Sequence, residues 1–312
     1  MNLQEYLLSE AEKCASWMLA SEYSPATVRR YGLVWRIFSG WVGSKPEEFS
    51  TLSCLTVGAL QSYLIELSLT PSRTNSAKLV STSHRSGHIS ALKWLFRYLH
   101  QHGKLLVNPS LDLKRPKEAK TLPRAVLTVS EIFKVLSIID TEKPTEMRNR
   151  AALELLYSTG IRRGELERLN LGSLRFGEQL LFVEGKGRKE RLVPVGQEAM
   201  RCVEFYLKTI RPKFVSSESP ALFLNIRGKR MKMKGLLKAL KAYAVEAGVK
   251  KHVNLHAIRH TCATHMLAGK ADIRHIQEIL GHASLNTTQL YTRVEISDLK
   301  EMLERCHPRD KF

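Results

Sequence analysis

The chain has 312 residues, of which 43% are hydrophobic, and a mean hydropathy of -0.21; this length suggests two domains, each with enough apolar side chains for a core. No run of about 18 apolar residues occurs, and the first residues lack the basic and apolar regions of a signal peptide, so we expect a cytoplasmic protein rather than a membrane or secreted one. The five cysteines are scattered, which excludes a disulfide framework and a cysteine zinc site, whereas 49 Lys and Arg against 30 Asp and Glu give a net charge of +19 and favour a polyanionic partner.

The first part of the chain shows the apolar periodicity of amphipathic helices. The stretch 70–76 between two of them is polar and has no periodicity, which is typical of a loop. Together these segments predict a small all-α domain over 1–108. Its helices are expected over 3–20, from Pro25 onward after a Ser24 cap, over 56–68 and over 84–102.

The outer faces of these helices carry basic side chains, among them Arg29, Arg30 and Arg97. Such residues either bind a nucleic-acid backbone or form an ordinary solvated face, and positive charge alone does not separate the two. The following stretch, 109–124, holds prolines and basic residues without periodicity, so we expect a linker suited to lie along a duplex. Residues 1–117 carry 14 basic and 8 acidic side chains, a net +6 that leaves +13 for the rest, so both halves are basic.

The remainder of the chain predicts a second, mostly helical domain over 125–312 with a small antiparallel sheet. Its first helix begins at a capping box in which either Thr128 or Ser130 is the cap. The stretches 179–184 and 190–195 form the only clear strand pair in the sequence. Further helices are expected over 148–157, 161–169, 197–210 and 234–248.

Two charged residues lie one helical turn apart just after the turn at Gly160. Arg162 is followed three residues later by Glu165, whose carboxylate could orient the guanidinium. An arginine held in this way is a rigid, two-pronged clamp for a phosphate. The alternative is an ordinary surface ion pair, which has the same spacing.

The loop between the two strands is basic and contains two glycines around Lys186. Gly185 and Gly187 would let this turn approach a partner closely, with Arg188 and Lys189 adding charge beside it. A solvated hairpin tip is the ordinary alternative. The spacing is not that of a Walker A loop, so the motif does not indicate nucleotide binding.

Near the end of the chain, His256 and Arg259 share one face of an expected helix and could converge on an anion. His282 follows a Leu-Gly pair, and Tyr291 follows nine residues later, which is room for a turn that returns a phenol to the same anion. His256 and His260 have metal-ligand spacing but lack the glutamate of His-Glu-x-x-His, and no aspartate cluster could hold magnesium. The sequence therefore indicates a phosphate site beside a tyrosine, with no metal or other cofactor.

Five motifs, each weak alone, resemble in this order the tyrosine recombinase (phage integrase) family, and most of all its bacterial Xer-like members. The resemblance implies a mainly α fold: an N-terminal all-α core-binding (SAM-like) domain, a basic linker, and a mostly α catalytic domain with a small antiparallel sheet and a tail helix. The first half is longer than in Xer proteins, with 70–83 the expected insertion. The motifs are Ser158 to Leu166, Gly185 to Arg191, His256 to His260, Leu280 to His282 and Tyr291-Thr292, and the ending Cys306 to Arg309 is similar to an Xer tail.

The resemblance also implies roles for particular side chains. Tyr291 would be the nucleophile, His256 its general base, and Lys186 the general acid for the leaving 5′ oxygen. Glu165 would hold Arg162 in place. The residues expected around the scissile phosphate are Arg162, Lys186, His256, Arg259 and His282.

The partners implied by the resemblance are a double-stranded DNA recombination site and other protomers. Four protomers, of this chain alone or with a sister recombinase, would exchange strands through a Holliday junction. In the family the helix after the tyrosine docks on a neighbour, although packing on the same subunit has the same spacing. The apolar stripe expected to do so is Ile296, Leu299, Met302, Leu303 and Cys306.

Two other functions are compatible with parts of the sequence. A type IB topoisomerase shares the arginine, lysine and tyrosine chemistry, but the separate helical domain and the Leu-Gly-His motif favour recombination. A non-catalytic DNA-binding accessory protein would use only the basic faces and would leave Tyr291 without a role. Chromosome or plasmid resolution and the integration or transposition of a mobile element stay open as biological roles.

Overall fold

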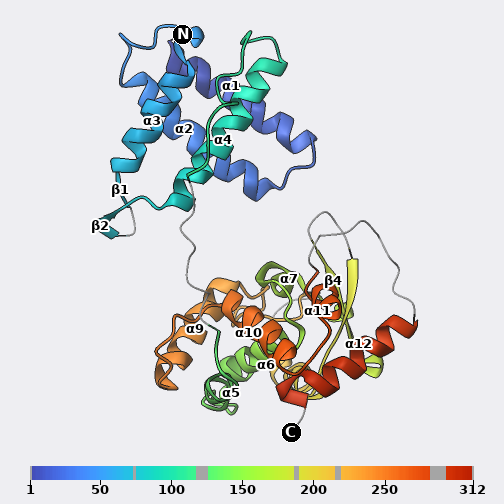
Figure 1. The fold of residues 1–312 in the computed structure, drawn as a ribbon. Helices are drawn as coiled ribbons and strands as arrows, with labels where there is room; N and C mark the ends of the chain where they lie inside the picture. The colour runs from blue at the N-terminus through green and yellow to red at the C-terminus, as the bar shows by residue number, and fades with distance from the viewer. Residues whose placement is uncertain are drawn as a thin grey trace. The chain divides into compact units, whose positions relative to one another are not determined.

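The protein is described by a computed structural model covering residues 2–72, 75–116, 126–185, 190–214, 219–281 and 293–310. The chain divides into two compact units, Met1–Thr121 and Leu122–Phe312, each with its own hydrophobic core (Figure 1). Half of the expected linker, residues 117–124, falls outside the described residues, so the exact domain boundaries stay a prediction. None of the helices in the described part of the chain combines the length and apolar composition that a membrane crossing needs.

The N-terminal unit is built from four helices, as the periodicity predicts. Side chains of Asn2, Ser24, Thr56 and Ser81 cap their first turns. In the core, Trp35 is fully buried and donates its indole N–H to the Ala91 carbonyl at 2.7 Å, which joins the second and fourth helices. The helices are α1 (Leu3–Ala20), α2 (Pro25–Gly43), α3 (Val57–Leu69) and α4 (Thr82–Gln101), with a short 3-10 turn at Leu52–Cys54.

The expectation of a plain loop over 70–76 is wrong. Two short strands, β1 (Pro71–Ser72) and β2 (Asn75–Leu79), pair in antiparallel fashion with Pro71 opposite Leu79. Most residues of the sequence 71–79 are polar, so this stretch lacks the apolar alternation by which a strand is recognised in a sequence. Backbone pairing satisfies its hydrogen bonds. The hairpin lies within the expected insertion relative to Xer proteins.

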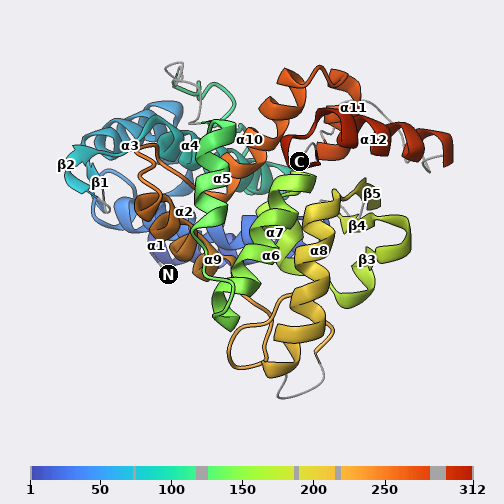
Figure 2. The same cartoon turned by 90° about the horizontal axis from the view of Figure 1, so that it is seen from below.

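The C-terminal unit is organised around α6, which is buried along most of its length. Tyr157 on this helix is fully buried, and α6 packs against α8 and α10 (Figure 2). Thr128, not Ser130, caps the first helix of the unit in a complete capping box with Glu131. The helices are α5 (Val129–Ser137), α6 (Pro144–Thr159), α7 (Arg163–Arg168), α8 (Gln197–Phe205), α9 (Met233–Glu246), α10 (Leu255–Ala268), α11 (Ile273–Leu280) and α12 (Arg293–Cys306).

The predicted strand pair is confirmed and gains a third member. The antiparallel sheet has the order β3-β4-β5, with β3 too short to be visible in the sequence pattern. Val183 on β4 pairs with Arg191 on β5. The strands are β3 (Leu174–Arg175), β4 (Leu180–Glu184) and β5 (Glu190–Pro194); short 3-10 or π turns cover Leu171–Ser173, Phe176–Glu178, Tyr206–Ile210, Arg211–Lys213 and Pro308–Asp310. The structure thus confirms the mainly helical fold class.

The apolar side of α12 packs on its own unit. Leu299, Met302, Leu303 and Cys306 are buried in the core of the C-terminal unit, and α12 contacts α10 and β5. In the single chain the stripe thus packs on its own subunit, the alternative that the spacing left open, and docking on a neighbour stays a prediction. The physical reason is simple: this helix covers an apolar surface of its own unit that would otherwise face water.

Candidate active site at the end of helix α11

The turn between α6 and α7 positions the first candidate residue. Gly160 ends α6 with a φ of +58°, a left-handed conformation that favours glycine. A Cβ atom here would also lie 2.7 Å from a methyl carbon of Leu280. The tight turn brings the end of α6 against the end of α11 and places Arg162 at the N-cap of α7.

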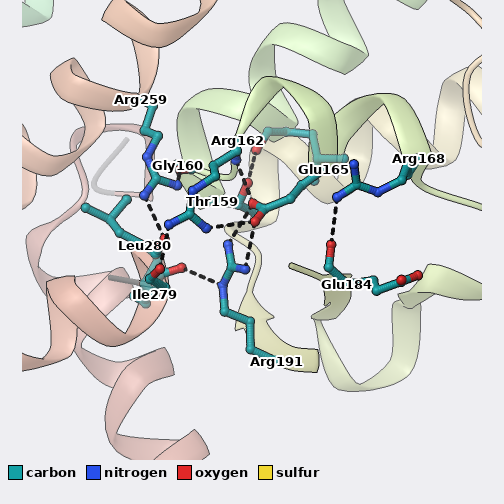
Figure 3. Close-up of polar contacts among 12 residues, drawn as sticks. Thr159, Gly160, Arg162, Glu165, Arg168, Glu184, Arg191, Arg259, Ile279 and Leu280 are labelled. Atoms are coloured by element: carbon teal, nitrogen blue, oxygen red, sulfur yellow. Dashed lines mark hydrogen bonds and ion pairs between the residues drawn. The ribbon is translucent and has the colours of Figure 1, made fainter. Parts of the chain in front are cut away.

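Arg162 and Glu165 form the clamp that their spacing predicts (Figure 3). The Arg162 backbone N–H donates to Glu165 Oε2 at 2.7 Å, and Nη1 donates to Oε1 at 2.9 Å. The Glu165 side chain is only 2% exposed, whereas that of Arg162 is 42% exposed. The pair is therefore no ordinary surface ion pair: a buried carboxylate fixes a guanidinium that still faces solvent.

A second arginine completes the surroundings of this carboxylate. Arg191, on β5, donates from Nη1 and Nη2 to the two oxygens of Glu165 at 3.1 and 2.8 Å. Burial raises the pKa of the Glu165 carboxyl, but hydrogen bonds from Arg191 and from the Arg162 backbone outweigh it and lower the pKa to about 2. Glu165 is thus a carboxylate at every physiological pH.

Arg259 lies in the interior beside this pair. The Asn254 side chain caps α10 by accepting the Ala257 N–H at 2.8 Å, and Arg259 follows in the second turn with only 6% exposure. Its guanidinium donates to the carbonyls of Gly160 and Leu280, each at 2.6 Å. Burial, and then the nearby charge of Arg162, lower the pKa of Arg259 to about 10, so it stays protonated at neutral pH.

The three guanidiniums meet at the carboxyl end of α11. Arg191 Nε donates to the Ile279 carbonyl at 3.2 Å, Arg259 to Leu280, and Arg162 Nη2 to the Gly281 carbonyl at 2.5 Å. The last carbonyls of a helix lack partners within the helix and carry its negative dipole end, so cations satisfy them well. This arrangement fixes the backbone directly before His282.

The cluster carries a surplus of positive charge. Three guanidiniums surround one carboxylate, which leaves a net charge of +2 on these four groups. Arg191 and Arg259 are buried, so Arg162 is the guanidinium of the three that an anion from solvent can contact most easily. A monoanion such as a phosphodiester, placed there, would be bound by donors that are already oriented.

His256 is the fourth predicted site residue that the structure describes. It is exposed on α10, three residues before Arg259, and its ring lies edge-on to that of His260 with the centroids 4.7 Å apart.

The structure thus brings together Arg162, Glu165 and Arg259 and places His256 one turn from Arg259. The other predicted site residues, Lys186, Arg188, Lys189, His282 and Tyr291, lie outside the described residues. Of the predicted DNA-binding residues, Arg29, Arg30 and Arg97 are exposed; Arg30 and Arg97 stack over Tyr31 and Trp94.

Sequence reasoning missed Arg191 and Gly281. Arg191 lies on the buried side of β5, two residues before the buried Val193. In the sequence, a charged residue at a strand position that should be apolar could have indicated that Arg191 has a polar partner in the interior. Gly281 has a φ of +63°, and a Cβ atom on it would lie 2.9 Å from Arg191 Cζ. A glycine between a helix and a histidine suggests a left-handed cap but not this close contact.

One group of side chains in the described residues has metal-ligand chemistry. Atoms of Glu154, Glu198 and Cys202 lie within 4.8 Å of one another. Arg309 and Arg150 already pair with Glu154, and burial raises the pKa of the Cys202 thiol to about 12, so it is not the thiolate that a metal requires. These residues do not fit a metal site.

Comparison with known proteins agrees with the sequence motifs. The model of the phage integrase family matches residues 125–297. Tyrosine recombinase XerC 2 of Ralstonia nicotianae is 38% identical over 93% of this chain and 83% of its own length. Tyrosine recombinase XerD of Lacticaseibacillus casei is 36% identical over 87% of this chain and 89% of its own length.

Solved structures share the fold at lower identity. The XerH site-specific recombinase in a post-cleavage complex with palindromic difH substrate has a TM-score of 0.67 and 23% identity, covering 89% of this chain and 79% of its own. A lambda integrase dimer bound to a COC' core site has a TM-score of 0.66 and 15% identity, covering 93% and 100%. With a family model over more than half of the chain and a relative aligned along nearly all of it, the chain belongs to the phage integrase family, among the tyrosine recombinases.

Proposed function

We propose that this tyrosine recombinase cuts and rejoins specific DNA sites through Tyr291, with the cluster of Arg162, Glu165, Arg191 and Arg259 holding the scissile phosphate. The observation that supports this most is the surplus of positive charge at an exposed, preoriented guanidinium. A phosphodiester is the anion that a basic protein of this family meets in DNA.

In this proposal Arg162 and Arg259 bind the non-bridging oxygens of the phosphate. A guanidinium has five N–H donors, so each arginine can add the phosphate as a further acceptor. Each can also exchange part of its contact with the α11 carbonyls for the phosphate. Charge that develops on these oxygens in the transition state is then neutralised by donors fixed in advance. The loss of one such donor typically slows a reaction by about 100- to 1000-fold.

Tyr291 supplies the nucleophile. Its oxygen attacks phosphorus, a phosphotyrosyl bond forms to the 3′ side of the break, and the bond to the 5′ oxygen breaks. His256 accepts the phenol proton, because a phenol with a pKa of about 10 is a weak nucleophile in its neutral form. Lys186 donates a proton to the leaving oxygen, which becomes a 5′ hydroxyl, and His282 donates a hydrogen bond to the phosphate. The reverse steps with another 5′ hydroxyl rejoin the strand without metal or ATP.

Recombination requires two duplexes and several protomers. One solved structure of similar fold, with a TM-score of 0.65, is a lambda integrase tetramer bound to a Holliday junction. We propose the same assembly here, in the cytoplasm, with this chain alone or with a sister recombinase. Exposed Arg29, Arg30 and Arg97, together with Arg188 and Lys189, would contact the DNA backbone.

Covalent attachment to DNA tests the proposal directly. A duplex selected from a random library by binding to the protein is nicked near its centre, so that cleavage releases a short fragment and traps the intermediate. We expect the wild type and Tyr243→Phe to form an adduct that survives a denaturing gel, since Tyr243 lies in the core on α9, where its hydroxyl accepts a hydrogen bond from Asn149. Tyr291→Phe should bind the duplex equally well and form no adduct.

The alternatives give other results in the same assay. An adduct formed by Tyr291→Phe would show that another residue is the nucleophile. No adduct from the wild type, despite specific binding, would favour a non-catalytic DNA-binding protein. Rapid relaxation of supercoiled DNA lacking the selected site would favour a topoisomerase.

A further inference from the structure

We propose that Arg230 is a positioning residue for Arg162. Its guanidinium holds the carboxyl end of α7, and the opposite end of this helix carries the clamp formed by Arg162 and Glu165. This inference rests on the proposed function, because the place of Arg162 affects cleavage only if its guanidinium binds the scissile phosphate.

The first observation is that α7 is a short helix with incomplete support. It spans six residues, and a helix of this length is not stable by itself in water. A cavity of about 290 Å³ lies beside it, lined in part by Glu165 and Arg168 of the helix and by Leu169 and Asn170 after it. Core packing therefore supports only part of the α7 surface, and contacts at the helix ends have to fix its direction.

The second observation is that Arg230 binds the carboxyl end of α7. Its Nη1 donates to the carbonyls of Glu167 and Leu169 at 2.9 and 2.8 Å, and its Nη2 donates to Asn170 Oδ1 at 2.6 Å. The last carbonyls of a helix lack partners within the helix and carry its negative dipole end, so a guanidinium satisfies them well. One side chain thus fixes three groups where α7 ends.

The third observation is a contact in the opposite direction, from α7 to the start of α9. Lys232 is the N-cap residue of α9, and a lysine side chain has no acceptor with which to cap a helix. Glu167 of α7 takes this role: its Oε2 accepts the backbone N–H of Met233 at 3.3 Å, and its Oε1 accepts from Lys232 Nζ at 3.1 Å. The end of α7 and the start of α9 therefore cap each other.

The segment that carries Arg230 is itself held in place. Arg230 pairs with Leu224 in an antiparallel bridge, and the next residue, Met231, donates its N–H to the Phe223 carbonyl at 2.9 Å. Leu236 on α9 is buried in the core of the C-terminal unit. Arg230 therefore joins α7 to a part of the unit that has its own support.

Two anchors are needed because each fixes only one end of α7. At the amino end, Glu165 accepts from Arg191 and from Arg162 (Figure 3). One anchored end leaves a helix free to tilt into the cavity beside it. Arg230 anchors the Glu167 carbonyl, two residues after Glu165, and removes this freedom. A rise of 1.5 Å per residue makes α7 only about 9 Å long, so a small tilt is enough to displace the Arg162 guanidinium.

Loss of the second anchor should slow cleavage. A misplacement of about 1 Å costs on the order of 100-fold where a reaction depends on positioned groups. We expect Arg230→Gln to slow single-turnover cleavage about 10- to 100-fold, while specific DNA binding stays within a few-fold of wild type. Arg230→Lys keeps the charge but not the planar fork that serves two carbonyls and an amide, so its effect should be intermediate.

A double variant shows whether Arg230 acts through Arg162. In the Arg162→Ala background the guanidinium to be positioned is gone, so adding Arg230→Gln should slow cleavage no further. A merely structural role would instead multiply the two losses, because a smaller folded fraction lowers the rate in either background.

A neutral substrate gives an independent readout. When a methyl group replaces one non-bridging oxygen of the scissile phosphate, this group carries no charge, and less charge develops for the arginines to neutralise. We expect Arg162→Ala and Arg230→Gln to lose less of the wild-type rate on this methylphosphonate than on the phosphate, with at least one of its two stereoisomers. Impaired folding would lower the rate by the same factor on every substrate.

Two variants serve as controls. Arg309→Ala removes a buried ion pair with Glu154 on α6, so it destabilises the same unit without touching α7. Arg175→Gln removes an exposed arginine that pairs with the exposed Glu178. Both should cleave the phosphate substrate within a few-fold of wild type, and thermal melting of every variant shows whether it is folded at the assay temperature.

Three results would overturn the inference. The first is cleavage by folded Arg230→Gln at the wild-type rate. The second is an equal relative loss from this change in the Arg162→Ala background or on both methylphosphonate isomers. The third is failure of both Arg230 variants to fold, which would make Arg230 a residue for stability. Failure of the wild type to form an adduct is distinguishable from all three, and it would reject the proposed function together with this inference.

Discussion

Two buried glutamates in the C-terminal unit are each held by two arginines, yet their surroundings differ in one decisive respect. Glu165 pairs with Arg162 and Arg191, and Glu154 pairs with Arg150 and Arg309. Both carboxylates are almost inaccessible to solvent. Pairing alone therefore does not separate a functional cluster from a structural one.

Charge balance and exposure make the difference. Near Glu154, Glu198 lies 3.7 Å from Arg309 and also pairs with the exposed Arg201, so two carboxylates meet three guanidiniums, a surplus of one. Arg309 also stacks over the Phe133 ring. Near Glu165, Arg259 adds a third cation, and Arg162 is 42% exposed. The Glu154 cluster has the smaller surplus of positive charge and fastens the segment after α12 to α6, whereas the Glu165 cluster has a surplus of two charges.

The largest expected effect comes from Arg162→Ala. This change removes a preoriented phosphate donor, so we expect cleavage to slow by about 100- to 1000-fold. Glu165 keeps both bonds to Arg191, and Arg162 is partly exposed, so the melting temperature should change little. Rates under single-turnover conditions and thermal melting measure the two effects separately.

Arg309→Ala should show the opposite pattern. It leaves Glu154 Oε2 without its partner in the interior, and breaking a buried pair in this way costs about 3 to 5 kcal/mol of unfolding free energy. The cleavage rate of the folded fraction should stay within a few-fold of wild type. If Arg309→Ala instead abolished cleavage without loss of stability, the assignment of the two clusters would be reversed.

The pH dependence of stability separates the clusters further. Burial lowers the pKa of His307, beside Arg309, to about 4, while the unfolded state binds a proton near pH 6.5. Stability from this group is therefore complete above pH 6.5 and declines by about 3 kcal/mol as the pH falls to about 4. Glu165, with its pKa lowered to about 2, loses its contribution only below about pH 4.5.

Replacing His307 isolates the decline in stability between pH 6.5 and 4. His307→Gln should flatten the decline in unfolding free energy between pH 6.5 and 4, because a glutamine does not titrate. Denaturant unfolding at several pH values measures this slope. An unchanged slope in the variant would show that other groups, such as the buried His88 and His265, dominate the acid response.

The smallest effect is expected at an exposed pair. Lys208 and Glu204 are bonded at 2.6 Å but lie largely in solvent, so Lys208→Ala should change the unfolding free energy by about 0.5 kcal/mol at most. Cleavage and the pH profile should match wild type. A larger loss would mean that pairing, rather than burial and charge balance, governs these clusters.

Local patterns in the sequence predict much of this fold and part of the site. Helix periodicity and capping residues give the main helices, and the i,i+3 spacing gives Arg162 with Glu165 and His256 with Arg259. Contacts between distant segments are not visible in such patterns. Arg309 reaches Glu154 across 155 positions, and Arg191 reaches Glu165 from another element. The same limit applies to the docking of α12 on its own unit and to the polar β1–β2 hairpin.

Mapping the covalent linkage tests the central claim most directly. The adduct formed by wild type on the nicked duplex is digested with protease and nuclease, and mass spectrometry identifies the residue and the nucleotide end that are joined. We predict a single phosphodiester between Tyr291 and a DNA 3′ end, with a free hydroxyl on the 5′ side of the break. Attachment at another residue, or to a 5′ end, would contradict the account.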